Sequence, residues 1–422
     1  MLPEPWQAVK NILAIRLDNI GDLVMLGPSL RSLRRALPQA AITLMVSPGG
    51  RQVAPLLPWV DDVLVHRAVW QDLSGSIPQD FQREIALVND IRNRRFDAAT
   101  IFTSFSQSPY PPAHVCYLAG IPIRLGQSKE FGGALLSRWV KPLPDATHQV
   151  DRNLHLLEAA GIPIAGRHLE LSIPDDVQAS ADQLLRDVGI QPRQRFILIA
   201  PGASCAARRY DPVRYGSVAR LLAAETRQPI VLVGSEREQS LVEPILADDH
   251  GGAIVSLVGR TSVPELAAVI GRATLVIAND SGPMHLADAL ERPMVILFSG
   301  TEYESQWQPR GAPTRLLRRP TACSPCYSFE CPYNMECLDI PPQEVAAEAL
   351  ALLRETRATN AVGDVRSRDS GGAEAQGSRG AGEISNRRAC PEAAEGLTAR
   401  SLQQPQVDHA FTASISRGES QP

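Results

Sequence analysis

The stretch that decides the fold is LVIANDSGPMHLADAL, residues 275–290. Its first four residues, Leu275–Ala278, are all apolar and predict a strand that is buried on both faces. The polar turn Asn279–Gly282 follows at once, and Pro283 suits the first position of a helix that runs to Leu290. A buried strand, a short turn and a helix form one unit of a parallel sheet that is covered by helices.

The same alternation of apolar runs and helical stretches continues in both directions from this unit. Continuous apolar strands are typical of a parallel sheet between two helical layers. Two series of them predict an α/β fold with two doubly wound domains, and Pro174 with its polar neighbours places the join near residues 166–176. The first series comprises residues 11–17, 41–46, 63–66, 98–102 and 121–125, and the second comprises residues 196–200, 230–233, 254–258, 275–278 and 294–298.

We therefore predict an N-terminal domain at residues 1–168, a C-terminal domain at residues 169–355 and a disordered tail at residues 356–422. The tail is rich in Gly, Ser, Ala and Gln, and Phe411 is its one aromatic residue. Such a segment cannot bury enough apolar surface to offset the entropy that ordering would cost.

Composition excludes several classes of function. The 422 residues include 42 Lys plus Arg and 46 Asp plus Glu, a net charge of −4, whereas nucleic-acid-binding proteins usually carry a basic surface. No run approaches the ~18–20 apolar residues of a membrane-spanning helix, and the N-terminus does not resemble a signal peptide, so we expect a cytoplasmic protein. The chain also lacks the glycine-rich dinucleotide motif, the P-loop and the H-E-x-x-H zinc motif.

A polar loop follows the first strand, with the sequence RLDNIGD at residues 16–22. Ligands of an open parallel sheet bind beyond the carboxyl ends of its strands. We expect Gly21 to let the backbone turn tightly and approach a ligand, and Asp22 to begin the next helix. The alternative is that Asp22 is only a helix N-cap and Gly21 only a turn residue.

A second loop, PGAS at residues 201–204, follows a strand of the second series and precedes Arg208 and Arg209. The hydroxyl of Ser204 and the two guanidinium groups suit a phosphate, because arginine offers planar pairs of donors. Without an anion, the two cations would oppose the dipole of the helix that follows. The alternative is a plain turn and a solvated basic helix start.

The turn that precedes Pro283 is a third candidate site. A helix that begins at Pro283 directs its free N–H groups and its positive dipole end at an anion. His285 falls in the first turn of this helix, where it faces either a ligand or the neighbouring domain. A histidine with a purely structural role is the alternative.

Four of the seven cysteines crowd into one proline-containing loop. Their spacing is compact enough for a structural zinc with four thiolate ligands, although it is not the paired C-x2-C pattern of zinc ribbons. Two disulfides or free thiols are the alternatives. We expect the loop to act as a staple that lies outside the cluster of Asp22, Arg208 and Asp280. The four residues are Cys323, Cys326, Cys331 and Cys337.

Three segments together resemble glycosyltransferase family 9, which contains the heptosyltransferases of lipopolysaccharide core synthesis. They are ILAIRLDNIGDLVMLGPSLRSLRRALPQAAITLMV at residues 12–46, the PGAS loop with its arginine pair, and LVGRTSVPELAAVIGRATLVIANDSGPMHLADAL at residues 257–290. The resemblance covers about residues 11–353. It implies a GT-B fold, in which two Rossmann-like domains face each other across a cleft, with the acceptor on the N-terminal domain and the nucleotide-sugar donor on the C-terminal one. It also implies an inverting, metal-independent transfer, from ADP-heptose in the best-known members.

The resemblance further implies roles for individual residues. Asp22 takes the place of the catalytic base. Ser204 and Arg208 fall where the family binds the donor phosphate, and many members have lysine in place of Arg208. Glu236 lies near the family's acidic contact to the ribose, with Glu238 as its rival. The family's donor-binding turn matches Asp280, Ser281, Gly282 and His285.

The resemblance thus implies an inverting glycosyltransferase that needs no cofactor for catalysis and transfers a sugar to a lipopolysaccharide-core or related cell-surface glycan. The expected donor is ADP-heptose. The expected partners are this nucleotide-sugar and a glycolipid or oligosaccharide acceptor, with peripheral contact at the cytoplasmic face of the inner membrane and no nucleic acid. The alternatives are a sugar-nucleotide epimerase of GT-B fold and a non-catalytic sugar-nucleotide-binding protein.

Overall fold

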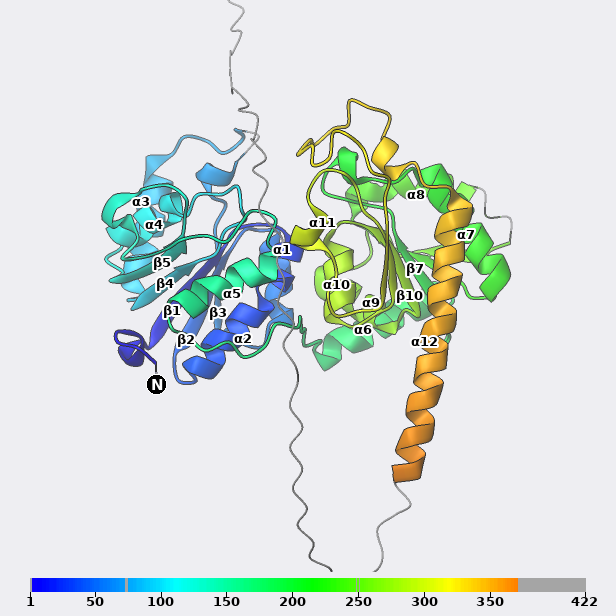
Figure 1. Ribbon diagram of the computed structural model, residues 1–422, viewed down its shortest axis with the longest axis horizontal. Coiled ribbons are helices and arrows are strands. Elements are labelled where there is room, and N and C mark those ends of the chain that lie inside the picture. Colours follow the sequence, from blue (N-terminus) through cyan, green and yellow to red (C-terminus); the bar gives the residue numbers. More distant parts are fainter. Residues whose placement is uncertain (1, 73–74, 248, 250, 371–422) are drawn as a thin grey trace, which may run out of the picture. The chain divides into compact units, whose positions relative to one another are not determined.

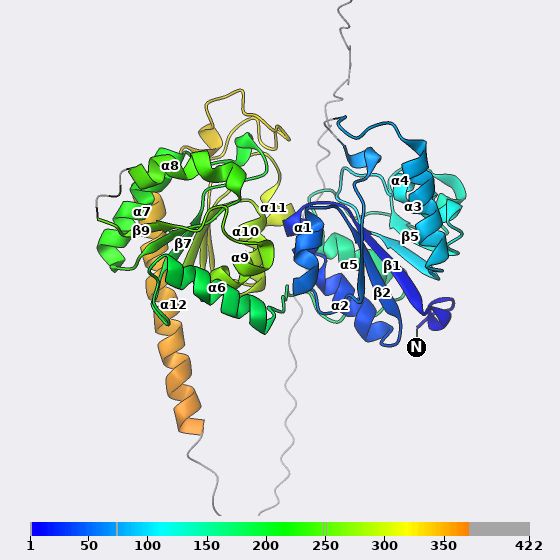
Figure 2. The same ribbon diagram turned by 180° about the vertical axis from the view of Figure 1, so that it is seen from behind.

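The computed structural model of the chain describes residues 2–72, 75–247, 249 and 251–370. This part of the chain contains two parallel sheets of six strands each (Figures 1 and 2). The first comprises β1 (Asn11–Arg16), β2 (Ala41–Val46), β3 (Asp62–Val65), β4 (Ala98–Ile101), β5 (Ile123–Gln127) and β6 (Arg138–Val140). The second comprises β7 (Ile197–Ala200), β8 (Ile230–Leu232), β9 (Ile254–Ser256), β10 (Leu275–Asn279), β11 (Met294–Leu297) and β12 (Thr314–Leu317).

Both sheets have the strand order of a doubly wound fold. The order is β3-β2-β1-β4-β5-β6 in the first sheet and β12-β11-β10-β7-β8-β9 in the second. Each sheet therefore reverses its winding direction once, between β1 and β4 and between β7 and β10. Ligands of such sheets bind at this switch point, beyond the carboxyl ends of the two strands. The predicted pair of doubly wound sheets is confirmed.

Helices connect successive strands and cover the faces of the sheets (Figures 1 and 2). Around the first sheet lie α1 (Ile20–Val24), α2 (Gly27–Ala36), α3 (Phe81–Asn93), α4 (Tyr110–Leu118) and α5 (Gln149–Ala159). Around the second sheet lie α6 (Asp175–Asp187), α7 (Pro212–Thr226), α8 (Gln239–Ala247), α9 (Val263–Arg272), α10 (Gly282–Ala289), α11 (Glu304–Trp307) and α12 (Pro342–Ser370). Short 3-10 turns include η2 (Gly50–Leu56), η5 (Ala206–Arg208), η6 (Glu236–Glu238) and η7 (Glu336–Leu338).

The central strands are buried along their length, as their unbroken apolar sequences predict. All five residues of β10 are buried, and so are all residues of β1 after Asn11. The sequence did not indicate β6 and β12, which occupy sheet edges. Both are short and only partly buried, so polar residues such as Arg138 and Arg315 are tolerated in them and mask the strand pattern.

The C-terminal helix α12 begins by packing on the second sheet. Val345, Ala349 and Leu352 belong to the same buried cluster as Leu275 and Ile277 of β10. Ala, Leu, Glu and Arg dominate the helix up to residue 358, and these residues favour helix strongly.

The predicted tail overlaps this helix. Residues 356–370 continue α12, and residues 371–422 lie outside the described part of the chain, so the disordered tail stays a prediction. The two sheets belong to one compact unit that ends at Ser367, and the domain boundary at 168/169 stays a prediction. Among the described residues, no helix is both long and apolar enough to cross a membrane.

Candidate active site

The predicted site residues gather where the two sheets reverse their winding direction. Asp22 follows β1, Arg208 follows β7, and Asp280 follows β10 directly. We call the part of the chain around the first sheet the first half and the part around the second sheet the second half. Helix α1 of the first half and helix α10 of the second half are neighbours (Figures 1 and 2). The two switch points are thus brought together, and the charged side chains of one half lie within electrostatic range of those of the other.

A fully buried arginine organises the first half of the site. Arg16, the last residue of β1, places its Nε 2.7 Å from Asp18 Oδ2 and its Nη2 2.5 Å from Asp22 Oδ1. Nη2 also donates a hydrogen bond of 2.8 Å to Ser104 Oγ. A buried guanidinium is tolerated only with such close partners, so these contacts fix the carboxylate of Asp22 in one orientation.

Asp22 also takes part in the cap of helix α1. Its Oδ2 accepts a hydrogen bond of 3.2 Å from the backbone N–H of Asn19, which completes a capping box. The N-cap of α1 is Asn19, so the alternative in which Asp22 itself is the N-cap is wrong. Asp22 is the third helical residue, and it completes the cap alongside its ion pair with Arg16. The side chain is 13% exposed and lies within electrostatic range of Arg208, Glu302 and His285 in the second half. A helix cap alone does not require any of these neighbours.

Asp18 is a further buried carboxyl group of this cluster. Burial raises its pKa, while Arg16 opposes that rise. Gln107 donates a hydrogen bond to Asp18 Oδ1 and accepts one of 3.0 Å from the backbone N–H of Ser104. Arg16 and Asp18 belong to the RLDNIGD loop, but no role was predicted for them from the sequence. A charged residue at the end of an otherwise apolar strand was the available signal for Arg16, whereas Ser104 and Gln107 are too distant in sequence to be linked to it.

His285 lies directly against the backbone of Gly21. A methyl group on Gly21 would lie 2.4 Å from His285 Cδ2, a distance that no packed structure accommodates. Burial lowers the pKa of His285 to about 4, so the imidazole is neutral at pH 7. The expectation that Gly21 makes a tight turn is wrong, because it lies within α1; a small residue is needed there because α10 comes so close.

Arg208 is the central cation of the second half. Its Nη2 lies 2.8 Å from Glu302 Oε2, and its Nε donates a hydrogen bond of 3.1 Å to Thr301 Oγ1. Asp280 Oδ2 lies farther away, at 3.9 Å from Nε. Neither Thr301 nor Glu302 was singled out from the sequence, because both lie after β11, more than ninety residues beyond Arg208. Arg209 only donates to the carbonyl oxygen of Ala203 among the described contacts.

Asp280 is buried without full compensation of its charge. Its Oδ2 accepts a hydrogen bond of 3.2 Å from Ser299 Oγ, and its Oδ1 has no hydrogen-bond partner in the described part of the chain. Burial raises the pKa of Asp280 to about 7, and the nearby Arg208 opposes that rise. The site therefore holds one carboxyl group that can exchange a proton near neutral pH.

The PGAS loop is held in place by Asn279, the last residue of β10. The buried amide Nδ2 donates to the carbonyl oxygens of Pro201 and Gly202, at 2.8 and 3.1 Å. Its Oδ1 accepts from the backbone N–H of Tyr210 and from the hydroxyl of Tyr215. Asn279 thus links the two loops that were predicted to bind the donor.

The remaining predicted residues differ in how closely they approach these loops. Ser204 and Glu236 are exposed. The carboxylate of Glu238 lies against Gly202, because a Cβ added to Gly202 would come 1.6 Å from its Oε1. Of the two glutamates that were candidates for the ribose contact, Glu238 is therefore the one beside the PGAS loop. Ser281 is the N-cap of α10, and Gly282 contacts Ile20 of the first half. Gly282 therefore contributes to the junction between the halves.

The cysteine loop is attached to the site by hydrogen bonds that its sequence did not indicate. The backbone N–H groups of Cys326 and Tyr327 donate to the carbonyl oxygens of Gly300 and Thr301, at 3.0 and 2.9 Å. Since Thr301 also accepts a hydrogen bond from Arg208, the expectation that the loop lies outside the cluster is wrong.

The state of the four cysteines stays a prediction. Their thiols are free, and no group of three or more His, Cys, Asp or Glu in the described ranges is arranged to hold a metal ion. Burial raises the pKa of the Cys337 thiol, and the proximity of Cys323, Cys326 and Cys331 adds to this effect. The four sulfurs are thus close enough to influence one another, which keeps both zinc and disulfides open to experiment.

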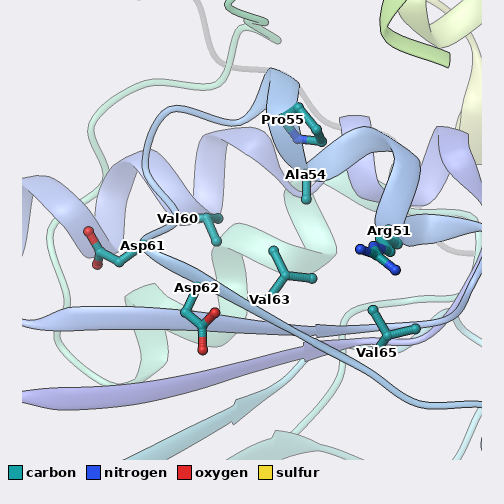
Figure 3. Close-up of a pocket in the computed structure, with 8 residues that line it drawn as sticks. All are labelled: Arg51, Ala54, Pro55, Val60, Asp61, Asp62, Val63 and Val65. Carbon is teal, nitrogen blue, oxygen red and sulfur yellow. The ribbon is translucent and has the colours of Figure 1, made fainter. Parts of the chain in front are cut away.

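A surface hollow of about 580 Å³ lies elsewhere on the first half, between η2 and β3 (Figure 3). None of the predicted site residues lines it. Its lining residues are Arg51, Ala54, Pro55, Val60, Asp61, Asp62, Val63 and Val65.

Comparison with known proteins decides the family. The model of glycosyltransferase family 9 (heptosyltransferase) matches residues 85–336, more than half of the chain. The chain belongs to glycosyltransferase family 9. The chain is thus a glycosyltransferase, and the family named from the sequence is confirmed.

Two curated relatives show how far the similarity of this glycosyltransferase extends. Lipopolysaccharide heptosyltransferase 2 of Salmonella typhimurium is 27% identical over 355 residues, which covers 82% of this chain and 99% of the relative. Lipopolysaccharide heptosyltransferase 3 of Escherichia coli is 23% identical over 295 residues and covers 68% and 82%.

Solved structures agree with the fold. The family 9 glycosyltransferase of Veillonella parvula superposes with a TM-score of 0.70 at 21% identity, covering 82% of this chain and 98% of that one. The ADP-heptose lipopolysaccharide heptosyltransferase II of Escherichia coli gives a TM-score of 0.67 at 24% identity, covering 82% and 99%. The predicted GT-B architecture is confirmed.

Proposed function

We propose that this enzyme is an inverting, metal-independent heptosyltransferase that transfers heptose from ADP-heptose to a sugar hydroxyl of a lipopolysaccharide-core glycan. The names of the relatives support the choice of sugar and acceptor. One geometric observation carries the mechanism. Asp22, oriented by the buried Arg16, lies on α1, which packs directly against α10 of the second half, just after the turn predicted to bind the donor.

In the proposed reaction, the acceptor hydroxyl attacks the anomeric carbon of the donor from the side opposite the diphosphate. A bond forms between the acceptor oxygen and that carbon, the bond to the diphosphate oxygen breaks, and the hydroxyl proton passes to the carboxylate of Asp22. The electron pair of the broken bond leaves with ADP. Inversion at the anomeric carbon follows from this single displacement.

The residues of the second half would stabilise the leaving group. Negative charge grows on the diphosphate as the bond breaks, and Arg208 is the cation that lies 3.9 Å from Asp280 and 2.8 Å from Glu302. The first N–H groups of α10, which begins at Gly282 after the N-cap Ser281, add a positive dipole end. We propose that these donors take the role that a divalent metal has in other transferases.

Acceptor-dependent release of ADP tests the proposal. Incubation with ADP-heptose and O-deacylated lipopolysaccharide truncated in the inner core should yield ADP and a product that is one heptose larger by mass spectrometry. The anomeric configuration of the new linkage, determined by NMR, should be opposite to that of the donor. Conversion of the sugar nucleotide without any acceptor would indicate an epimerase, and ADP binding without turnover would indicate a non-catalytic protein.

We also propose that the enzyme contacts the membrane surface where such an acceptor resides. Phe81 and Ile85 on α3 and Leu118 at the end of α4 are exposed, with Phe81 at 70% exposure. The two helices lie side by side (Figures 1 and 2), and Arg92 of α3 donates a 2.7 Å hydrogen bond to the carbonyl oxygen of Leu118. Apolar side chains beside a cation suit the surface of an anionic bilayer.

Sedimentation with phosphatidylglycerol-containing vesicles tests this contact. The double variant Phe81→Glu/Ile85→Glu should lose most of the vesicle binding of the wild type. Leu221→Glu, which alters an exposed apolar residue on α7, should keep it. Equal binding by all three proteins would contradict a contact through α3.

A further inference from the structure

Two aromatic side chains from opposite halves of the enzyme meet beside the site. Phe105 lies in the loop after β4, and Tyr327 lies in the cysteine loop. Their ring centroids are 5.7 Å apart and the rings are tilted by 45°. Tyr327 remains 48% exposed, so the contact leaves much of its ring available to a ligand.

The backbone around Tyr327 is tied to the residues that hold Arg208. The N–H of Tyr327 donates to the carbonyl oxygen of Thr301, whose side chain accepts a hydrogen bond from Arg208. Two residues later, the carbonyl oxygen of Phe329 accepts a hydrogen bond of 3.0 Å from Ala207, the neighbour of Arg208. The loop is thus anchored to the second half on both sides of its aromatic residue.

Tyr327 adopts a backbone conformation that is unfavourable for a bulky side chain. Its φ is 52°, in the left-handed region that favours glycine. Residues held in this region are often found at active sites and ligand clamps.

Phe105 lies next in sequence to a residue that contacts the Arg16–Asp22 ion pair. It follows Ser104, which accepts a hydrogen bond from Arg16, the partner of Asp22. Glu302 lies within electrostatic range of both Asp22 and Tyr327. The aromatic pair is therefore linked to the Arg16–Asp22 ion pair through Ser104 and to Arg208 through Thr301.

We propose that Phe105 and Tyr327 form a subsite for the acceptor sugar. A sugar ring presents patches of C–H groups that pack on aromatic faces, and the Tyr327 hydroxyl adds a polar contact at the edge. The pair holds the acceptor so that its reacting hydroxyl meets Asp22. Because the ring of Tyr327 comes from the donor half, the subsite is complete only when both halves are in place. This inference rests on the proposed sugar transfer.

The test compares steady-state kinetics of Phe105→Ala, Tyr327→Ala and Tyr327→Phe, with ADP-heptose as donor and O-deacylated, inner-core-truncated lipopolysaccharide as acceptor. The control is Phe329→Ala, which removes an aromatic side chain of the same loop that is 66% exposed. Slow hydrolysis of ADP-heptose by water and calorimetric binding of ADP report on the donor side without the acceptor.

We expect Phe105→Ala and Tyr327→Ala to raise the acceptor KM about tenfold or more, an effect of the size that loss of an aromatic contact produces. Tyr327→Phe should lie between the wild type and Tyr327→Ala. ADP affinity, donor hydrolysis and the Phe329→Ala variant should stay within about twofold of the wild type.

An unchanged acceptor KM in both alanine variants overturns the subsite while leaving the transferase intact. Equal losses in acceptor KM, ADP affinity and donor hydrolysis also overturn it, because the pair would then only join the two halves. If Tyr327→Ala does not fold, Tyr327→Phe and Phe105→Leu provide the same comparison. Absence of sugar transfer by the wild type contradicts the proposed function and the subsite with it.

Discussion

The buried carboxylates of the two halves of the site differ in how close they lie to a cation. In the first half, Asp18 and Asp22 lie 2.7 and 2.5 Å from the guanidinium of Arg16. In the second half, the buried Asp280 is 3.9 Å from the nearest nitrogen of Arg208, and one of its oxygens has no described partner. Both halves contain a buried polar atom without a hydrogen-bond partner among the described residues, Nη1 of Arg16 in the first and Oδ1 of Asp280 in the second. Only the first half holds its buried aspartates at contact distance from a cation.

This difference suggests a division of work in which the first half accepts the proton and the second half binds the donor. A carboxylate that takes a proton in the transition state must be held in one orientation before substrate binds, and Arg16 does this for Asp22. A site that binds a charged nucleotide gains affinity from groups that find their partners only on binding. We therefore expect changes in the first half to affect the rate, and changes in the second half to affect donor affinity as well.

Asp22→Asn should cause the largest loss of activity. The amide can still cap α1 but cannot accept the acceptor proton, so kcat should fall about 10²- to 10⁴-fold. Asp18→Asn is the matched control, because Asp18 contacts the same Arg16 but is not the proposed base. If Asp18→Asn lowered kcat more than Asp22→Asn at equal melting temperature, the base would be misassigned.

Arg208→Ala should weaken ADP binding and lower turnover together, each by about 10- to 100-fold, as expected for lost hydrogen bonds to charged groups. Arg208→Lys should recover part of both, because the charge is kept while the paired geometry is lost. Arg209→Ala serves as the control, since its guanidinium only donates to a backbone carbonyl among the described contacts. A larger effect at Arg209 would place the phosphate there.

Gly21→Ala should destabilise the junction between the halves by about 1–3 kcal/mol, because the new methyl group would overlap the ring of His285. Gly282→Ala offers a comparison at the same junction, since its added Cβ would lie at an ordinary 3.4 Å from Ile20. Urea unfolding measures both. Similar free energies of unfolding for the two variants would show that α1 and α10 are not in close contact.

The stability of the free enzyme should carry a pH-dependent contribution from Asp280. Burial raises its pKa from the ordinary 3.8 to about 7, so the folded state keeps a proton that the unfolded chain has released. This contribution to the free energy of unfolding falls as pH rises from about 4 to about 7, by up to ~1.4 kcal/mol per pH unit.

Asp280→Asn should remove that slope, as urea unfolding between pH 4 and pH 8 can show. His285 acts in the opposite direction, because its pKa is lowered to about 4 and its contribution is lost as pH falls below 6.5. The variant should therefore lose relative stability at low pH compared with the wild type. The exposed Asp339→Asn is the control, and an identical pH dependence in all three proteins would contradict the buried state of Asp280.

The smallest expected effect is that of a chelator. EDTA should leave turnover unchanged, because the proposal gives the leaving-group charge to Arg208 and to the N–H groups of α10. Metal analysis of anaerobically purified protein, with about one zinc per chain expected if the cysteine loop binds it, separates a structural metal from a catalytic one. Activity lost in EDTA and restored by Mg²⁺ at constant melting temperature would contradict the mechanism.

Features that depend on a short stretch of sequence could be predicted from the sequence. Buried strands such as β1 and β10 are visible as apolar runs, and the loops that follow them contain Asp22 and Asp280. The contacts that give these residues their environment are not local. Arg16 meets Ser104 across 88 positions, and Arg208 meets Thr301 across 93.

The cysteine loop shows the same limit. The spacing of its cysteines predicted that a metal ion or disulfides stabilise the loop, and such a loop can lie anywhere on the surface. Only the fold shows that two backbone hydrogen bonds join the loop to Gly300 and Thr301. Edge strands were missed for a related reason, because partial exposure lets Arg315 occupy β12 and hides its pattern.

Calorimetric titration of ADP into Asp22→Asn and Arg208→Ala, side by side with the wild type, tests the division of work most directly. We expect Asp22→Asn to bind ADP within about twofold of the wild type although its turnover is nearly lost, and Arg208→Ala to bind ADP at least tenfold more weakly. Weak ADP binding by Asp22→Asn together with unchanged binding by Arg208→Ala would contradict this division of work.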